Sequence, residues 1–120
     1  MINNEKKFLR KIYKDKRSNT HISQFKKLCK GIFDNLLELS IWDKDIYHVY
    51  LSVESKNEVN TNDILSFILN KNKRVIVPKM INNNLIHLEI DQNTKFNTNK
   101  FGIREPISKV KFDTSLIEII

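Results

Sequence analysis

The apolar positions in the first forty residues follow a helical period. Phe8, Leu9 and Ile12 recur at helical spacing within residues 3–17 and give a first predicted helix one apolar stripe. Residues 18–20, Ser-Asn-Thr, interrupt the pattern and supply a predicted N-terminal cap for a second helix. Apolar residues then repeat at three- and four-residue spacing: Ile22, Phe25, Cys29, Ile32, Leu36 and Leu39. The chain is therefore expected to open with two amphipathic helices.

A strand pattern follows. Residues 46–51, Ile-Tyr-His-Val-Tyr-Leu, are dense in β-branched and aromatic side chains and predict a first strand. After a polar loop, Thr61 is expected to cap a third helix, which ends at residues 70–73. The inward face of that helix is predicted to consist of Ile64, Leu65, Ile68 and Leu69.

The rest of the chain predicts further strands. Residues 74–77 form a short apolar strand closed by Pro78, residues 82–84 are three asparagines that predict a turn, and residues 85–90 predict a paired strand. Residues 116–120 predict another buried strand. A strand, helix, strand unit of this length implies a right-handed crossover and a parallel pair. The predicted class is therefore α/β, with helices packed on a mixed, mainly parallel sheet in a Rossmann-like three-layer arrangement.

Composition agrees with one folded domain over residues 1–120, because no linker, repeat or low-complexity tract divides the chain. Apolar residues make up 40% and charged residues 29%, which is typical of a globular protein. No apolar run approaches the roughly 20 residues that span a bilayer, so no membrane partner is expected. The single cysteine, Cys29, cannot form an internal disulfide, which favours a cytoplasmic location. Cys29 is expected to pack in the core.

The net charge of +7 is concentrated at the N-terminus. Residues 1–30 hold ten Lys and Arg against two acids, whereas the remainder holds eleven bases against twelve acids. A local excess of this kind attracts anions such as nucleotide phosphates or a nucleic-acid backbone. Residues four apart share a helix face, so Lys6, Arg10, Lys14 and Arg17 are expected to project together.

Three short pieces then occur in an informative order: residues 6–10 (Lys-Lys-Phe-Leu-Arg), residues 57–61 (Asn-Glu-Val-Asn-Thr) and residues 101–106 (Phe-Gly-Ile-Arg-Glu-Pro). With the strand-like Val-Ile-Val-Pro-Lys of residues 75–79, the series resembles the 5-formyltetrahydrofolate cyclo-ligase family, also called methenyltetrahydrofolate synthetases. The resemblance implies an enzyme that uses ATP and Mg²⁺, with 5-formyltetrahydrofolate as its substrate. In the family, the formyl oxygen takes the γ-phosphoryl group, N10 attacks the activated carbon, and phosphate leaves to give 5,10-methenyltetrahydrofolate.

The resemblance also implies roles for individual residues. Lys6 and Arg10 match the family's ATP-phosphate contacts, and an ammonium beside a guanidinium suits a polyphosphate. Glu58 matches a folate-binding glutamate, Leu51 would line the same pocket, and Phe101 matches an aromatic residue beside the folate. From the residues alone, purely structural interpretations of these positions remain open. Lys6 and Arg10 could belong to a solvated basic face, and Glu58 could be an exposed loop acid. Leu51 could be a packing residue, and Phe101 could anchor a surface loop. The glutamate tail of a folate is a further possible anion for the basic helix.

The resemblance covers nearly all of this chain but roughly the N-terminal two-thirds of a family member. Family members continue past the segment that matches residues 116–120 into a glycine-rich phosphate loop and Tyr-Tyr-Asp. Catalytic residues are therefore expected outside this chain, and the fold is expected to be truncated at its C-terminus. Gly31 and Gly102 cannot form a substitute phosphate loop. The three histidines lack metal-ligand spacing, so no metal site is expected.

Two other classes stay open. The chain could be a non-catalytic remnant, or a split subunit that assembles with a complementing C-terminal fragment. It could also be a small basic RNA-binding module, in which cations contact phosphates and aromatic rings stack on bases. The RNA reading is less favoured, because it leaves the central and C-terminal motifs unexplained.

Overall fold

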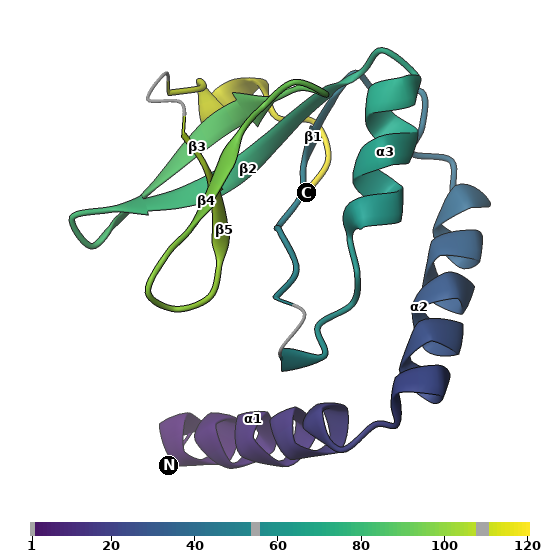
Figure 1. Cartoon of the computed structure of the whole chain (residues 1–120), viewed down its shortest axis with the longest axis vertical. Coiled ribbons are helices and arrows are strands. Elements are labelled where there is room, and N and C mark those ends of the chain that lie inside the picture. The colour runs from purple at the N-terminus through teal and green to yellow at the C-terminus, as the bar shows by residue number, and fades with distance from the viewer. Residues whose placement is uncertain (1, 54–55, 108–110) are drawn as a thin grey trace.

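The computed structural model describes residues 2–53, 56–107 and 111–120. Two long helices, α1 (Ile2–Ser18) and α2 (Ile22–Leu37), precede the first strand, β1 (Ile46–His48). Helix α3 (Asn62–Asn70) and strands β2 (Arg74–Ile81) and β3 (Asn84–Ile90) follow. A short hairpin of β4 (Phe96–Thr98) and β5 (Arg104–Pro106) comes next, and a 3₁₀ turn (Thr114–Leu116) precedes the C-terminal residues (Figure 1).

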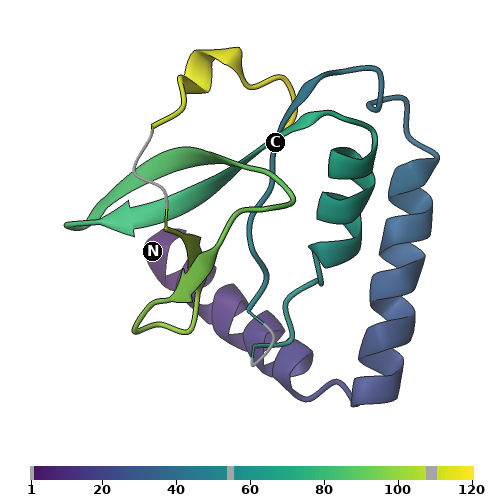
Figure 2. The same cartoon turned by 45° about the horizontal axis from the view of Figure 1, so that its top comes forward.

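The main sheet has the strand order β1-β2-β3. β1 and β2 pair parallel over three register positions, and β2 and β3 pair antiparallel over seven. Helix α3 makes the connection between the parallel strands, as the crossover argument requires. The α/β class and the mixed sheet are confirmed by this arrangement. Figure 2 shows α3 between the sheet and α2, so both helices lie on one side of the sheet.

The sequence predicted that the strand beginning at Arg74 would be closed by Pro78. This prediction is wrong, because β2 continues to Ile81. Pro78 lies two residues after Ile76, whose carbonyl accepts a hydrogen bond from the N–H of Val49, just beyond β1. Alternate residues of a strand direct their backbone groups to the same side, so Pro78 faces the side on which β1 has already ended. A proline has no N–H to donate, and the position requires none.

The turn between β2 and β3 is the one that the asparagines predict. Asn82 and Asn83 have φ angles of +49° and +65°, and they connect the paired residues Ile81 and Asn84. Two consecutive residues with positive φ are typical of a type I′ turn, which matches the twist of a two-stranded ribbon. Asparagine tolerates this conformation better than most residues do.

The core lies between the sheet and α3. Val75, Val77 and Tyr47 point from the sheet toward Leu65 and Ile68, and all five side chains are buried. The Trp42 ring packs against this core, with its centroid 4.9 Å from that of Phe67. The indole Nε1 of Trp42 donates to the carbonyl of Leu36 at 2.9 Å, which ties the C-terminal end of α2 to the core.

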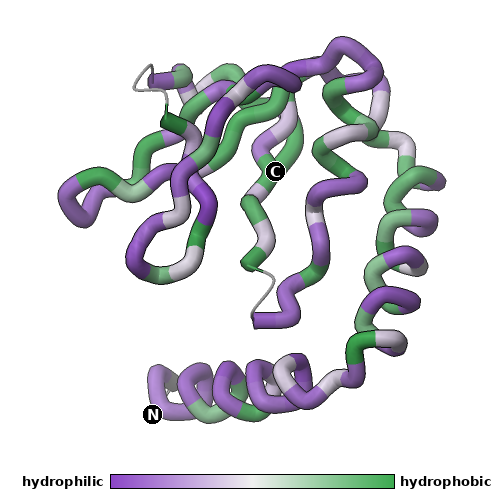
Figure 3. The backbone as a smooth tube through the Cα atoms, in the orientation of Figure 1, coloured by the Kyte–Doolittle hydropathy of each residue, from purple (hydrophilic) through white to green (hydrophobic). Residues whose placement is uncertain are grey.

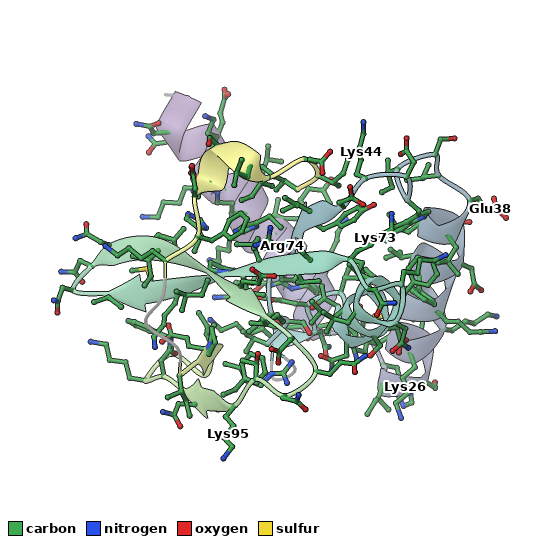
Figure 4. The ribbon with its side chains drawn as sticks, turned by 90° about the horizontal axis from the view of Figure 1, so that it is seen from above. Lys26, Glu38, Lys44, Lys73, Arg74 and Lys95 are labelled. Atoms are coloured by element: carbon green, nitrogen blue, oxygen red, sulfur yellow. The ribbon has the colours of Figure 1, made fainter. Side chains whose placement is uncertain are left out.

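An ion pair on the surface of the sheet also connects β2 with β3. Arg74 of β2 makes a two-pronged ion pair with Glu89 of β3, with Nη2 to Oε1 at 2.7 Å and Nε to Oε2 at 3.0 Å. Its guanidinium lies 5.0 Å from the Phe112 ring centroid. Figure 4 shows Arg74 on the sheet, Lys26 on the outside of α2 and Glu38 at the C-terminal end of that helix.

Helices α1 and α2 are much less covered. Both match the predicted periodicity, but α2 has no buried residue, and Phe8 on α1 is 64% exposed. Figure 3 shows that α1 carries its apolar positions among many hydrophilic ones. The predicted cap of α2 is wrong by one position: the N-cap is His21, whose Nδ1 accepts from the N–H of Ser23 at 3.3 Å, and Thr20 Oγ1 donates back to Lys16.

Residues 116–120 do not form the predicted buried strand. The segment begins in the 3₁₀ turn and then meets β1 at a single parallel bridge between Tyr47 and Ile119. The N–H of His48 donates to the carbonyl of Ile119 at 2.7 Å. Leu116 is 51% exposed and Ile120 is 96% exposed, so an apolar sequence is not sufficient here to form a buried strand.

Candidate functional site

The loop that carries Glu58 folds back onto the segment that follows β1. Leu51, Ser52 and Val53 are all buried beyond the end of β1. Glu58 Oε2 accepts a hydrogen bond from the N–H of Val53 at 3.2 Å. Glu58 is thereby fixed, half-buried, beyond the C-terminal end of a parallel strand, where α/β folds commonly bind ligands.

Thr61 occupies the N-cap position of α3 but does not cap it through its side chain. Its Oγ1 instead donates to the carbonyl of Tyr50 at 2.8 Å and accepts from the N–H of Ser52 at 3.3 Å. Asn60 Oδ1 accepts from the N–H of Asn62 at 2.8 Å. The polar residues of the Asn-Glu-Val-Asn-Thr motif therefore close the loop as well as start the helix.

Phe101 lies in the loop between β4 and β5, and its side chain is 59% exposed. Asn99 Oδ1 shapes this loop by accepting from the N–H groups of Phe101 at 2.9 Å and Ile103 at 3.0 Å. Gly102 has a φ of +79°, and a Cβ placed on it would lie 3.9 Å from Val53 Cγ1. The Phe101 loop therefore lies against Val53, the residue whose N–H binds Glu58.

Two segments more than forty residues apart in the sequence thus meet at Val53. One presents the Glu58 carboxylate, and the other presents the exposed Phe101 ring. Neither Glu58 nor Phe101 lines the cavity beside α3 or the hollow on α1. The cleft expected between Glu58 and Phe101 stays a prediction.

Leu51 is only 5% exposed and lines a cavity of about 560 Å³ between α3 and the β4–β5 hairpin. Arg104 crosses this cavity: its Nη2 donates to Asn62 Oδ1 at 2.8 Å, and its guanidinium lies 5.7 Å from the Phe96 ring centroid. The sequence did not predict this cavity, because the short strands of the hairpin carry no clear periodicity. Arg104 belongs to the Phe-Gly-Ile-Arg-Glu-Pro motif, and this was the signal that could have identified it.

Lys6 and Arg10 both lie on exposed positions of α1. Arg10 lines a shallow hollow of about 500 Å³ that Lys6 does not line, together with Asn4, Lys7, Phe8, Lys11 and Lys14. The hollow is therefore rich in cations and includes one aromatic ring. A common phosphate site for Lys6 and Arg10 stays a prediction that their four-residue spacing supports.

Lys79 and the histidines have structural partners. Lys79 donates from Nζ to the carbonyl of Pro106 at 2.7 Å and so ties the small hairpin to β2. His48 Nε2 lies 2.9 Å from His87 Nδ1, and burial lowers the pKa of His48, with a further lowering from the charge of His87. Within the described residues, no group of three or more His, Cys, Asp and Glu could hold a metal ion.

The fold and the placement of these residues define an α/β protein with candidate ligand-binding groups beyond the end of a parallel strand. The model of the 5-formyltetrahydrofolate cyclo-ligase family matches residues 2–120, and the chain belongs to that family. No curated protein matches the chain. None of the described helices is long and apolar enough to cross a membrane.

A solved structure shares the fold. The NMR structure of Aquifex aeolicus 5,10-methenyltetrahydrofolate synthetase superimposes with a TM-score of 0.80 at 23% sequence identity. The match covers 99% of this chain and 59% of the Aquifex protein. The chain therefore spans well under two-thirds of the length of that relative.

Proposed function

We propose that this chain is the N-terminal part of a cytoplasmic enzyme that converts 5-formyltetrahydrofolate to 5,10-methenyltetrahydrofolate with ATP. Membership of the cyclo-ligase family over residues 2–120 supports the reaction class. The observation that carries the site is the meeting of the Glu58 loop and the Phe101 loop at Val53. The single half-buried thiol, Cys29, agrees with a reducing compartment.

Each candidate residue has a role that its chemistry supports. The Glu58 carboxylate can accept hydrogen bonds from the amide and amino donors of a pterin, and the exposed Phe101 ring can cover a flat heterocycle. Lys6 and Arg10 bind ATP phosphates through charge and through the bidentate guanidinium. Holding the folate and the nucleotide in a reactive geometry is the contribution that this part of the enzyme makes to phosphoryl transfer.

Magnesium is not assigned to residues of this chain. Mg²⁺ prefers octahedral oxygen ligands and is commonly held by one or two carboxylates together with substrate phosphates. Since the part of the chain that the structure describes offers no cluster of potential metal ligands, Mg²⁺ is proposed to arrive with ATP.

A further polypeptide segment is proposed to complete the enzyme. The chain matches 59% of the Aquifex protein, and an apolar groove of about 550 Å³ runs between α2, α3 and the outer side of β1. Apolar side chains from both helices and from the C-terminal residues line it, among them Ile32, Leu36, Ile64, Ile68, Ile119 and Ile120. A complementing fragment that covers this groove would bury surface that is now open to water.

Ligand binding by the purified chain tests the proposed site. Calorimetry should show binding of 5-formyltetrahydrofolate that weakens about ten-fold in Glu58→Gln, since a charge-assisted hydrogen bond is lost. ATP binding should weaken by a similar factor, about ten-fold, in the double variant Lys6→Ala/Arg10→Ala. The matched control is Lys26→Ala/Lys30→Ala, which removes two exposed charges from α2 and should leave both affinities unchanged.

Turnover distinguishes the alternatives. The chain alone should not form 5,10-methenyltetrahydrofolate, because the groups that position the γ-phosphoryl group are expected elsewhere. A purified chain that turned over without another polypeptide would contradict the need for a complementing segment. Absence of binding of either ligand would favour a non-catalytic remnant. An RNA-binding role has no separate support, because the family match includes the basic helix itself.

A further inference from the structure

The end of α1 is joined to the loop that carries Glu58 through one side chain, Asn57. Asn57 Nδ2 lies 3.0 Å from the carbonyl oxygen of Arg17, 3.4 Å from that of Thr20 and 3.5 Å from that of Ser18. These carbonyls belong to residues 17–20, the elbow between α1 and α2. The last carbonyls of a helix lack partners within the helix, so an amide donor is well matched to this position.

Asn57 also sets the direction of the loop. Its φ of +50° lies in the left-handed region, which asparagine tolerates. The next residue, Glu58, binds the N–H of Val53. A continuous series of contacts therefore runs from the end of α1, through Asn57 and Glu58, to Val53 in the buried segment that follows β1.

The ionisable groups that act on Tyr50 come from both helices and from the loop. Tyr50 donates its O–H to the carbonyl of Val59 at 3.1 Å. Burial and the Glu58 carboxylate raise the pKa of Tyr50, with a further rise from Cys29, whereas the positive charge of Arg17 lowers it. The Asn57 contacts place the last turn of α1 beside this loop, and the Arg17 cation therefore acts on the Tyr50 phenol.

Little else fixes α1 against the rest of the molecule. Among the hydrogen bonds and ion pairs of the described residues, only those of Asn57 connect residues 2–20 with residues 41–120. Lys6 lies eleven residues before Arg17, about 16 Å along the helix axis. A rotation of about 20° at the elbow would therefore move Lys6 by about 6 Å, which is far more than a productive contact tolerates.

We propose that Asn57 is a positioning residue that fixes the orientation of α1 relative to the Glu58 loop. Its effect on ATP rests on the proposed function, because only that function makes Lys6 and Arg10 phosphate contacts. The connection that Asn57 makes between the end of α1 and the Glu58 loop, here called the tether, does not depend on the proposed function. Asn57 never touches the reacting atoms in this proposal, and it acts through the helix that it holds.

Two variants separate the tether from the turn. Asn57→Asp keeps the shape of the side chain and its tolerance of positive φ, but the carboxylate cannot donate to a carbonyl. Asn57→Gly accepts the same backbone conformation without any side chain. The matched controls are Asn72→Asp and Asn72→Gly, since Asn72, two residues after α3, has a φ of +58° and its side chain makes no hydrogen bond to the described residues.

The measurement is the distance distribution between spin labels on α1 and on the β4–β5 side of the molecule. Labels at Lys11→Cys and Lys95→Cys, in a Cys29→Ser background, use exposed positions on each part. Both Asn57 variants should broaden the distribution by about two-fold or more, because the helix loses its anchor, whereas the Asn72 variants should leave it unchanged. Thermal unfolding of each variant confirms that the sheet remains folded.

A distribution that stays as narrow as in the wild-type chain in both Asn57 variants would overturn the proposal and leave Asn57 as a backbone turn residue only. A wild-type distribution already as broad as those of the variants would overturn it equally. No nucleotide or folate is present in this experiment, so its outcome is separate from that of the ligand titrations. Broadening in a chain that binds neither ligand would sustain the tether and reject the proposed function.

Discussion

The sheet and the two N-terminal helices differ sharply in how their apolar residues are used. In β2, Val75, Ile76 and Val77 are completely buried. On α1, by contrast, Phe8 and Leu9 are 64% and 50% exposed, although they form the stripe expected of an amphipathic helix. An apolar stripe predicts that a helix forms, but burial requires a second surface. The sheet and α3 provide that surface for each other, and α1 lies outside it (Figure 1).

The two groups of candidate binding residues also differ in how the rest of the molecule supports them. Glu58 and the Phe101 loop are supported by buried residues through Val53. Lys6 and Arg10 are carried by an exposed helix that is connected through the Asn57 elbow. The residues proposed to bind folate are thus expected to be preorganised by the core, whereas the residues proposed to bind ATP depend on a small number of contacts.

The largest expected effect tests whether stability is concentrated in the sheet. Leu88→Ala should lower the free energy of unfolding by about 3 kcal/mol, because Leu88 is completely buried and its removal leaves a cavity. Leu9→Ala on α1 should change it by less than about 0.5 kcal/mol. Denaturant unfolding measures both. A Leu9 variant as unstable as the Leu88 variant would show that α1 packs on a surface in solution.

A control on the same strand sharpens this test. Leu85 lies on β3, three residues before Leu88, and is 55% exposed. Leu85→Ala should also change stability by less than about 0.5 kcal/mol, since little apolar area is lost from the core. A large loss in this variant would attribute the effect to strand propensity and not to burial.

The accuracy of the sequence-based predictions differs between elements that depend on local patterns and elements that depend on distant neighbours. The two N-terminal helices and the Asn82-Asn83 turn depend on local patterns, and they form as predicted. The continuation of β2 through Pro78 depends on where the neighbouring strand ends, which no local pattern contains. Residues 116–120 have the apolar sequence of a buried strand, but only one bridge to β1 is formed.

The candidate site was predictable as a set of residue types but not as an arrangement. The motif order indicated Glu58 and Phe101 as candidates, whereas the meeting of their two loops at Val53 depends on the close approach of Gly102. The role of Asn57 was not predicted, because its partners lie about forty residues away in the sequence. Contacts of this kind appear only once the chain has folded.

A smaller effect is expected where the linker after α2 is attached to the sheet. The O–H of Tyr47 lies 2.8 Å from the carbonyl of Ile41 and 2.9 Å from that of Lys44, and it donates to them. Tyr47→Phe should lower the free energy of unfolding by about 1 kcal/mol, since these part-buried carbonyls lose their donor. Tyr13→Phe on α1, where the side chain is 61% exposed, is the matched control and should have no measurable effect. Equal effects of the two variants in thermal unfolding would contradict the division between the regions.

The smallest expected effect is a dependence of stability on pH that arises in the sheet and not in the helices. Burial, followed by the charge of His87, places the folded-state pKa of His48 below its usual value of 6.5. On acidification, the unfolded chain therefore binds a proton at His48 before the folded chain does. The stability that neutral His48 contributes is complete above about pH 6.5. This stability is lost as the pH falls from about 6.5 toward the folded-state pKa.

The pH dependence is measured as the thermal unfolding midpoint between about pH 7.5 and about pH 5.5, where the carboxylates have not yet begun to titrate strongly. His48→Gln should flatten the decline of the midpoint over this range, because the glutamine does not titrate. His21→Asn is the control from the helical region: asparagine preserves a cap for α2, and the decline should persist. If the His48 variant retained the full decline, the pH response would not arise at His48, and if the His21 variant removed it, the response would be assigned to the helices.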